Sequence, residues 1–497
     1  MGISDGGGSL SEGLFRYVWA ALDGDPEIAQ AVSFSGGQAL PGCFGYTDMV
    51  AATLAGASAA ISELLAAGGH APRPVHVDRV LASGWVLNLT RPVAPRARLK
   101  WPFTVNGEYP TADGRYLRLT ATHKHLQART MAVLGCAETP EAVAAEILRH
   151  DADDIEQAIV DGGSVAAASR SIAEWAEHPH GGAVRTEPLI AVRERGGIED
   201  RWRPTPGRPL AGIRVLDFTR VIAGPMATRW LAGFGAEVLR IDAPDFDEWI
   251  MEPGPIGLTI GKRCARLDMR TAEGREHFLR LLSEADVFVH GLRPGAFDSL
   301  GVGDEVRARA NPNIVEVQHN AYGWTGPWAG RRGFDSIVCY SSGVWQETLR
   351  QAGFDKPSHE TLHLIQPILL DHCAGYLDAA AAVRGLTRRL KEGKGSLSRL
   401  SLARMLWMMI DAGQPKPEPE IVLPVDGPYE DRVYVNPDGP VRRLKFPAPV
   451  ADNPFFWERP GDTYGSSTPE WVTSRQVGRV SEIALEDAVF DSLVSVR

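Results

Sequence analysis

The chain has few cysteines, and their arrangement excludes two kinds of stabilisation. Only five of the 497 residues are cysteine, and no two of them form a Cys-x-x-Cys pair. An odd, sparse set of this kind does not suit a disulfide framework or a cysteine-based zinc site, and it fits a reducing compartment. We therefore expect a cytoplasmic protein. The five are Cys43, Cys136, Cys264, Cys339 and Cys373.

Long apolar runs and an excess of positive charge are also missing. No run of about 18 apolar residues is evident, so no segment is expected to span a membrane. Residues 1–13 have neither the basic nor the apolar region of a secretory signal. Lysine and arginine number 52 against 62 acidic residues, a net charge of −10, and such a surface does not bind nucleic acid through bulk charge. We expect neither a membrane nor a nucleic acid as a partner.

Three well-known motifs of nucleotide and ester chemistry are absent as well. The chain has no Gly-x-Ser-x-Gly elbow, no P-loop, and no Gly-x-Gly-x-x-Gly turn after its first clear α/β strand. The last absence argues against a nicotinamide or flavin enzyme, because those glycines let the backbone approach the pyrophosphate.

What is present is the composition of an ordinary folded protein. Apolar residues make up 44% and charged residues 23% of the chain, and the length suits two to four domains. Two proline-rich, loop-like stretches, 196–210 and 412–431, divide the sequence. The resulting blocks are residues 10–195, residues 208–411 and a C-terminal tail at 432–497, which we expect to pack on the large domain.

The middle block alternates short apolar runs with helical patterns. Strands are predicted at 213–218, 237–242, 287–289 and 314–317, with helical segments between them. This alternation predicts an α/β domain built on an open, doubly wound parallel sheet, Rossmann-like but without the glycine fingerprint. The first block is predicted to be mainly helical, with a strand entered from a turn at Asp113-Gly114.

The turn Arg220–Pro225, after the first of these strands, is a candidate binding site. Ligands of open parallel sheets bind beyond the carboxyl ends of the strands, and a helix N-terminus favours an anion such as phosphate. The alternative is a helix start that binds nothing. Several basic residues would suit the same anion, although each alone is also typical of a solvated surface. They are Lys262, Arg263, Arg293, Arg331 and Arg332.

Asp371 is the most notable carboxylate, because it follows the apolar run Pro367–Leu370 and opens an alanine-rich helix. Either it caps the helix by accepting a free N–H, or it is a nucleophile or base that the helix dipole keeps ionised. Nearby, His359-Glu-Thr-Leu-His363 spells a zinc motif. Because Pro367 ends any helix one turn later and no third ligand is evident, we expect no metal site.

A weak internal repeat relates two alanine-rich helices. The segment from Asp48 aligns with the segment from Asp371, and Ala51 matches Ala374. Both aspartates therefore open equivalent helices, and either is a candidate nucleophile.

Five segments of the second block together resemble the family III CoA-transferases, the group of formyl-CoA and carnitine CoA-transferases. They occur in that family's order and spacing: LAGIRVLDFTRVIAGPMATRWLAGFGAEVLRID (210–242), GKRCARLDMRTAEGR (261–275), HGLRPGAFDSLG (290–301), GWTGPWAGRRGFDSI (323–337) and LLDHCAGYLDAAAAV (369–383). Residues 46–195 look like a later portion of such a protein, with its smaller α+β domain. The resemblance thus implies a partial tandem, in which this later portion precedes a Rossmann-like CoA-binding portion with the nucleophile helix.

The resemblance implies an acyl-CoA:carboxylate CoA-transferase. Its nucleophile would be Asp371, acting through an aspartyl anhydride and an aspartyl-CoA thioester. Its substrates would be an acyl-CoA and a carboxylic acid, with coenzyme A as co-substrate and no tightly bound cofactor. Family members form interlocked dimers, so we expect a homodimer. The residues that the resemblance assigns to CoA binding are Arg220, Val221, Ile222, Ala223, Gly224, Arg240, Lys262, Arg263, Leu292 and Arg293.

Departures from the family keep two alternatives open. The related α-methylacyl-CoA racemases carry a His where this chain has Phe334, so a CoA-ester isomerase or racemase would lack one of its two bases. His290-Gly291-Leu292 replaces the family's Glu-Asn-Phe, and the tandem is incomplete, which suits a non-catalytic acyl-CoA-binding paralogue. For Asp48 we expect only a helix N-cap, since no strand–helix unit that would hold CoA precedes it.

Overall fold

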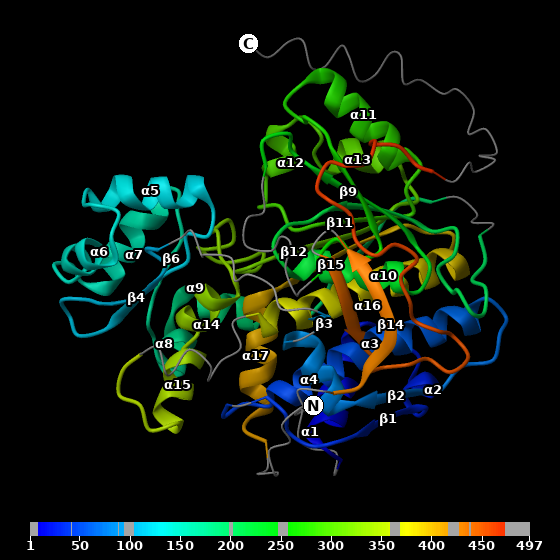
Figure 1. The fold of residues 1–497 in the computed structure, drawn as a ribbon, viewed down its shortest axis with the longest axis horizontal. Helices are drawn as coiled ribbons and strands as arrows, with labels where there is room; N and C mark the ends of the chain where they lie inside the picture. The colour runs from blue at the N-terminus through cyan, green and yellow to red at the C-terminus, as the bar shows by residue number, and fades with distance from the viewer. Residues whose placement is uncertain are drawn as a thin grey trace.

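A seven-stranded sheet forms the centre of the molecule. The computed structural model describes residues 8–40, 42–87, 89–93, 104–197, 202–246, 257–357, 368–415, 427–436 and 439–472, and Figure 1 shows their arrangement. The strand order is β10-β9-β8-β11-β12-β13-β7. Every neighbouring pair is parallel except β13 and β7, which are antiparallel. The predicted α/β class with a doubly wound, mostly parallel sheet is confirmed.

The middle block supplies most of this sheet and its helices. Its elements are β8 (Arg214–Phe218), α10 (Ala223–Gly233), β9 (Glu237–Asp242), β10 (Lys262–Arg266), α11 (Ala272–Ser283), β11 (Val287–His290), α12 (Ala296–Ser299), α13 (Asp304–Ala310), β12 (Val315–Asn320), α14 (Asp335–Ser341), α15 (Val344–Gln351), α16 (Leu369–Glu392), β13 (Ser396–Ser401) and α17 (Leu402–Ala412).

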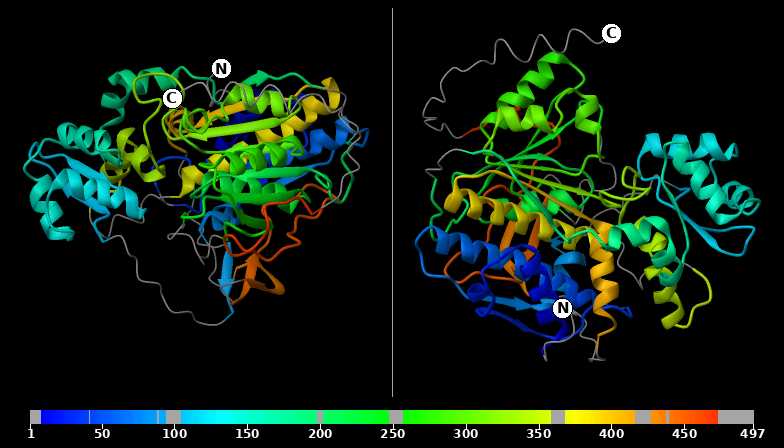
Figure 2. Two further views of the ribbon diagram at one scale, coloured as in Figure 1. Left: turned by 90° about the horizontal axis from the view of Figure 1, so that it is seen from above. Right: turned by 180° about the vertical axis from the view of Figure 1, so that it is seen from behind.

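Different helices cover the two faces of the sheet. Val215 of β8 belongs to the core that α10, α16 and α3 share, whereas its neighbour Leu216 belongs to the core beneath α11. Successive residues of a strand point to opposite faces, so burial on both faces explains the continuous apolar runs of the sequence. In Figure 2, α3 and α16 lie side by side along one face.

The N-terminal block forms the layer beside α16. Its elements are α1 (Leu10–Ala21), α2 (Pro26–Ala29), β1 (Val32–Ser35), α3 (Tyr46–Ala67), β2 (Val75–Asp78), α4 (Arg79–Leu87) and β3 (Thr90–Pro92). Helix α3 is long and apolar enough to cross a membrane by length and composition. However, 94% of its most apolar stretch is buried inside the fold, as in a core helix. The sequence pattern had indicated no such segment.

A small domain projects from one side of the molecule (Figure 1). A three-stranded sheet, in the order β4-β5-β6, packs there against three helices. The chain then returns to the central sheet through β7. The elements are β4 (Gly107–Pro110), β5 (Tyr116–Leu119), α5 (Lys124–Leu134), α6 (Pro140–Ile147), α7 (Ala152–Asp161), β6 (Ala166–Ala168), α8 (Ile172–Glu177), α9 (Pro179–Arg185) and β7 (Ala191–Glu194).

The C-terminal tail divides its contacts between two regions. Strands β14 (Tyr429–Asn436) and β15 (Gly439–Leu444) form a sheet with β3 of the N-terminal block. Farther on, Trp471 Nε1 donates a hydrogen bond to the Leu281 carbonyl of α11, at 3.2 Å. The described part of the tail therefore contacts α11 of the large domain and also extends the N-terminal block.

Candidate functional site

The turn after β8 has an unusual backbone. Val221 has a φ of +64°, a conformation that a β-branched residue adopts only under strain. Ile222 then stands at the N-cap position of α10 without a side-chain hydrogen bond to the helix. A Cβ on Gly224 would lie 2.2 Å from Thr219 Cγ2, so only glycine fits there. Surrounding contacts hold this turn at the carboxyl edge of the sheet, where the sequence placed a ligand.

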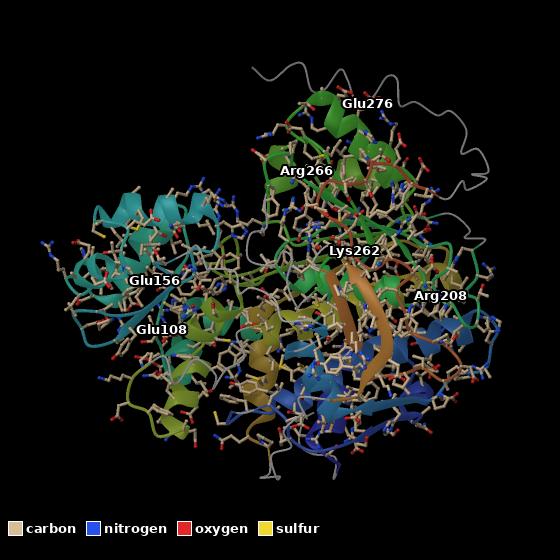
Figure 3. The ribbon with its side chains drawn as sticks, in the orientation of Figure 1. Glu108, Glu156, Arg208, Lys262, Arg266 and Glu276 are labelled. Carbon is tan, nitrogen blue, oxygen red and sulfur yellow. The ribbon has the colours of Figure 1, made fainter. Side chains whose placement is uncertain are left out.

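The cations predicted to bind CoA fall into two groups. Arg240 and Lys262 are fully buried: Arg240 Nε lies 3.0 Å from Asp242 Oδ2, and Lys262 Nζ lies 2.9 Å from Asp217 Oδ2. Lys262 also donates to the Pro225 carbonyl of α10 at 2.9 Å, deep inside the molecule in Figure 3.

Arg263 likewise makes internal contacts. It donates to the backbone carbonyls of Thr468, at 3.1 Å, and Glu470 in the C-terminal tail. These three residues, predicted to bind CoA, therefore make interior contacts, and they shape the turn and the sheet edge rather than line an open site.

Electrostatics support the structural role of Lys262. Burial lowers the pKa of the Lys262 ammonium group. Burial alone would raise the pKa of Asp217, but the charges of Lys262 and Arg240, together with hydrogen bonds from two threonines, leave that pKa below its usual value. The carboxylate thus compensates two buried cations beneath the turn.

Other predicted residues lie at the edge itself. Arg220 pairs with Asp242 at 2.7 Å, and its guanidinium lies 4.3 Å from the centre of the Phe246 ring. Leu292 and Arg293 lie in the turn after β11, and Arg293 is exposed. The structure therefore brings the turn Arg220–Gly224 and the Leu292-Arg293 turn to the same edge, because parallel strands end there together.

Two further arginines join Arg293, one of which the sequence analysis did not single out. Burial and the charges of Arg293 and Arg129 lower the pKa of Arg332, which precedes α14. Arg129 comes from α5 of the small domain. None of the three has an acidic ion-pair partner among the described residues. This non-local convergence of like charges suits an anionic ligand. By contrast, Arg331 pairs with Glu156 of the small domain at 2.9 Å.

His123 joins the small domain to the edge. Its ring lies parallel to the Phe334 ring at 6.2 Å between centres, and 5.9 Å from the Phe246 ring that faces Arg220. The neighbouring His125 has a lowered pKa, because of burial and then of the charges of His123, Arg129 and Arg332. Neither histidine carries a sequence motif, so only the fold reveals their position.

Asp371 lies in the first turn of α16, in dry surroundings. Its residue exposure is 7%, and no described group donates a hydrogen bond to its carboxylate. Burial, followed by the charge of Asp335, raises its pKa well above the usual value. This raised pKa runs against the expectation that the helix dipole keeps the group ionised. The N-cap interpretation is also wrong: Ile368 occupies that position.

Asp335 is the functional candidate that sequence reasoning missed. Its Oδ2 accepts hydrogen bonds from the backbone amides of Leu370, at 2.7 Å, and Asp371, at 3.1 Å. Burial raises its pKa as well. A carboxylate from α14 thus satisfies free amides at the start of α16 and fixes the backbone of Asp371. The motif Gly333-Phe334-Asp335 was the available signal.

The repeat-related Asp48 has a different environment. It is the third residue of α3, whose N-cap is Gly45, so the predicted N-cap role is wrong. Its carboxylate accepts hydrogen bonds from Arg79 and Gln38, both at 2.9 Å, and from Ser11. Both oxygens of this buried carboxylate accept hydrogen bonds, in contrast to those of Asp371.

Metal ligation gains no support from geometry. Within the described parts of the chain, no group of three or more His, Cys, Asp or Glu side chains is arranged to hold a metal ion. The segment His359–His363 lies outside the described residues.

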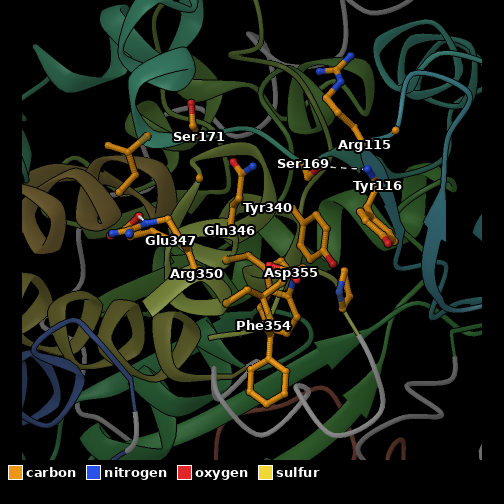
Figure 4. A pocket seen from close by; sticks show the side chains of 16 residues that line it. Arg115, Tyr116, Ser169, Ser171, Tyr340, Gln346, Glu347, Arg350, Phe354 and Asp355 are labelled. Atoms are coloured by element: carbon orange, nitrogen blue, oxygen red, sulfur yellow. Dashed lines mark hydrogen bonds and ion pairs between the residues drawn. The ribbon is translucent and has the colours of Figure 1, made fainter. Parts of the chain in front are cut away.

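A cavity of about 400 Å³ lies between the small domain and the α14–α15 pair (Figure 4). Tyr116 of β5 and the stacked rings of Tyr340 and Trp345 line it, and Arg350 and Asp355 also border it. Asp371 is not among its lining residues, so this cavity is separate from Asp371.

Comparisons with known proteins agree with the geometry. Residues 210–416 match the family model of CoA-transferase family III. A probable fatty acyl-CoA transferase of Mycobacterium tuberculosis, Rv3272, is 32% identical over 43% of this chain and 58% of its own length. The succinyl-CoA:glutarate CoA-transferase of Mus musculus is 30% identical over 38% of this chain and 44% of its own length.

A crystal structure of the Mycobacterium tuberculosis protein Rv3272 covers 40% of this chain and 56% of its own, at 30% identity and a TM-score of 0.36. The chain thus spans about half the length of these relatives. The matched region contains the strained turn, the basic sheet edge and Asp371. Residues 210–416 of this chain are therefore similar to CoA-transferase family III.

Proposed function

We propose that the protein is an acyl-CoA:carboxylate CoA-transferase with Asp371 as its nucleophile. The observation that carries this proposal is the state of the Asp371 carboxylate: it is desolvated, receives no hydrogen bond from a described group, and is fixed at its backbone by Asp335. A carboxylate with a raised pKa is more basic, and so more nucleophilic once ionised. The named relatives supply the reaction class.

The chemistry splits one acyl transfer into steps that balance. The Asp371 carboxylate attacks the thioester carbonyl, so a mixed anhydride forms and CoA leaves as its thiolate. The thiolate then attacks the aspartyl carbonyl, giving an aspartyl-CoA thioester and releasing the donor acid. The acceptor carboxylate attacks this thioester, so a second mixed anhydride forms and CoA again leaves as its thiolate. The thiolate then attacks the acyl carbonyl of the acceptor, which gives the new acyl-CoA and regenerates the Asp371 carboxylate. Covalent catalysis of this kind lowers each barrier separately.

The basic sheet edge is the proposed place for the CoA phosphates. Arg293, Arg332 and Arg129 combine like charges with no described acidic partner, and a polyanion would relieve their repulsion. The turn Arg220–Gly224 lies at the same carboxyl edge. The expected homodimer and cytoplasmic location remain predictions.

An isotope-exchange assay tests the function. Acetyl-CoA with ¹³C-labelled acetate, and succinyl-CoA with ¹³C-labelled succinate, are incubated with the protein, and the label in the CoA ester is followed by mass spectrometry. Exchange that disappears in Asp371→Asn supports the transferase. Exchange of the α-hydrogen with solvent deuterium, without label transfer, would replace it with an isomerase. CoA binding with neither reaction would point to a non-catalytic paralogue.

A further inference from the structure

His319 and Asp378 form an ion pair beneath the sheet edge. His319 lies near the carboxyl end of β12, and its Nδ1 is 2.7 Å from Oδ2 of Asp378 on α16. The Asp378 side chain is 0% exposed and that of His319 is 10% exposed. The contact lacks hydrogen-bond geometry, and no described group donates a hydrogen bond to either Asp378 oxygen. Because an unpaired buried carboxylate is costly, the imidazole is the group that compensates Asp378.

The opposite edge of the His319 ring faces two glycines of the proposed CoA site. A Cβ on Gly291, in the turn after β11, would lie 2.3 Å from His319 Nε2. A Cβ on Gly224, in the turn after β8, would lie 2.9 Å from His319 Cε1. Both distances are too short for real Cβ contacts, so the ring approaches both turns as closely as glycine allows.

Helix α16 approaches the same turn from another side. A Cβ on Gly375 would lie 2.5 Å from the Ala223 carbonyl oxygen and 2.6 Å from Met226 Cβ. Asp371, Gly375 and Asp378 are spaced four and three residues apart, which places them on one helix face. The residues Ala223-Gly224 are therefore held between α16 and His319, next to the strained Val221.

We propose that the His319–Asp378 pair is a positioning device that holds the Val221–Gly224 turn in its CoA-binding conformation and ties it to the nucleophile helix. A strained turn persists only where its surroundings fix it, and this pair connects the turn after β8, the turn after β11 and α16. The proposal rests on the proposed function, since it assigns His319 a role in binding CoA. His319 itself is not assigned a chemical step.

Calorimetry with free CoA tests the pair without requiring turnover. We expect His319→Ala to weaken CoA binding by about tenfold to a hundredfold, since small misplacements of binding groups have effects of this size. Asp378→Leu, which removes the partner while keeping an apolar volume, has the same expected effect. His319→Asn places a side-chain nitrogen near the position of Nδ1, so it recovers most of the affinity. The matched control is His76→Ala, on the exposed face of β2.

A double-mutant cycle examines the contact with the turn directly. Gly291→Ala adds a methyl group against Nε2 and weakens CoA binding in the wild-type background, whereas the same change costs less in His319→Ala, where the ring is gone. Additive losses would contradict the contact.

The outcomes separate the two proposals. Wild-type protein that binds no CoA refutes the proposed function and the role of the pair with it. If the wild-type protein binds CoA and His319→Ala binds it equally tightly, the positioning role of the pair is refuted while the proposed function stands. Thermal unfolding of every variant measures how much of the protein is folded. If the loss of CoA affinity in each variant, including His319→Asn, equals its loss of folded protein, the pair is merely structural and the positioning role is wrong. Acyl exchange should show a raised KM with a smaller change in kcat.

Discussion

Helices α3 and α16 carry the same residue type at the same helical position, in opposite surroundings. Asp48 and Asp371 are each the third residue of a long, buried helix, and the two helices pack along each other. Asp48 accepts hydrogen bonds from Arg79, Gln38 and Ser11. Asp371 instead lies beside a second carboxylate, Asp335, which raises its pKa.

The difference suits a structural role for Asp48 and the proposed nucleophilic role for Asp371. Three donors lower the energy of the Asp48 carboxylate, and such a carboxylate is a poor nucleophile. Burial and a like charge raise the energy of the ionised Asp371. The sequence analysis preferred Asp371 as the nucleophile because a strand–helix unit precedes it. The surroundings of the two carboxylates add an electrostatic reason for that preference.

Removing the reactive carboxylate has the largest expected effect. Asp371→Asn should lower the rate of acyl exchange at least about 10³-fold, because the amide cannot form the anhydride. Rates are measured with the same acyl-CoA, and CoA binding serves as the control for an intact site. Asp48→Asn, measured in parallel, should keep most of its rate per folded molecule. A reversed result would make the first copy the working one.

Removing the paired carboxylate tests the other side of the comparison through stability. Asp48→Ala leaves the buried Arg79 without its charge partner, which typically costs about 3–5 kcal/mol of folding free energy. The free energy of unfolding is measured in urea, with Asp25→Ala, at the N-cap of α2, as a control that costs about 0.5–2 kcal/mol. A loss for Asp48→Ala no larger than that of the control would contradict the account.

Replacing Asp335 sharpens the account of the Asp371 environment. Asp335→Asn keeps an oxygen that accepts the amides of Leu370 and Asp371 but removes the like charge. The pKa of Asp371 should fall, so the acid limb of the kcat/KM profile moves to lower pH. Rates between pH 5 and pH 8 measure the shift. An acid limb that stays in place would mean that burial alone sets the Asp371 pKa.

The smallest expected effect is a gain in stability. The pKa of Asp371 is raised on folding, so the folded state binds more protons than the unfolded state, and stability falls as pH rises through the folded pKa. Asp371→Asn removes this penalty and should raise the free energy of unfolding at pH 8, with a smaller gain at pH 5. Equal gains at both pH values would contradict the raised pKa.

Local sequence patterns were enough to predict the strands of the large domain and the segments that match the family motifs. Apolar runs gave the strands, and the family motifs identified Asp371 and the turn Arg220–Gly224. Local sequence could not predict the burial of Arg240 and Lys262, because charged residues are usually exposed. The two side chains can be buried because the carboxylates of Asp242 and Asp217 compensate their charges.

The contacts that the sequence missed all join distant segments. Asp335 reaches the amides of Leu370 and Asp371 only because α14 packs near the start of α16. Arg129 and His123 reach the sheet edge because the start of α5 in the small domain lies near Arg332 and Phe334. The Arg79 partner of Asp48 lies on α4, outside the helix that the repeat defined, so a helix cap was the nearest interpretation that local sequence offered.

Trapping of the covalent intermediate tests the central claim most directly. The protein is mixed with an acyl-CoA that supports exchange and with hydroxylamine, which converts an aspartyl anhydride or thioester into a stable hydroxamate. Peptide mass spectrometry then locates the modified aspartate. The account predicts a hydroxamate at Asp371 and an unmodified Asp48 in the same digest. A hydroxamate at Asp48, or continued exchange with Asp371 unmodified, would contradict it.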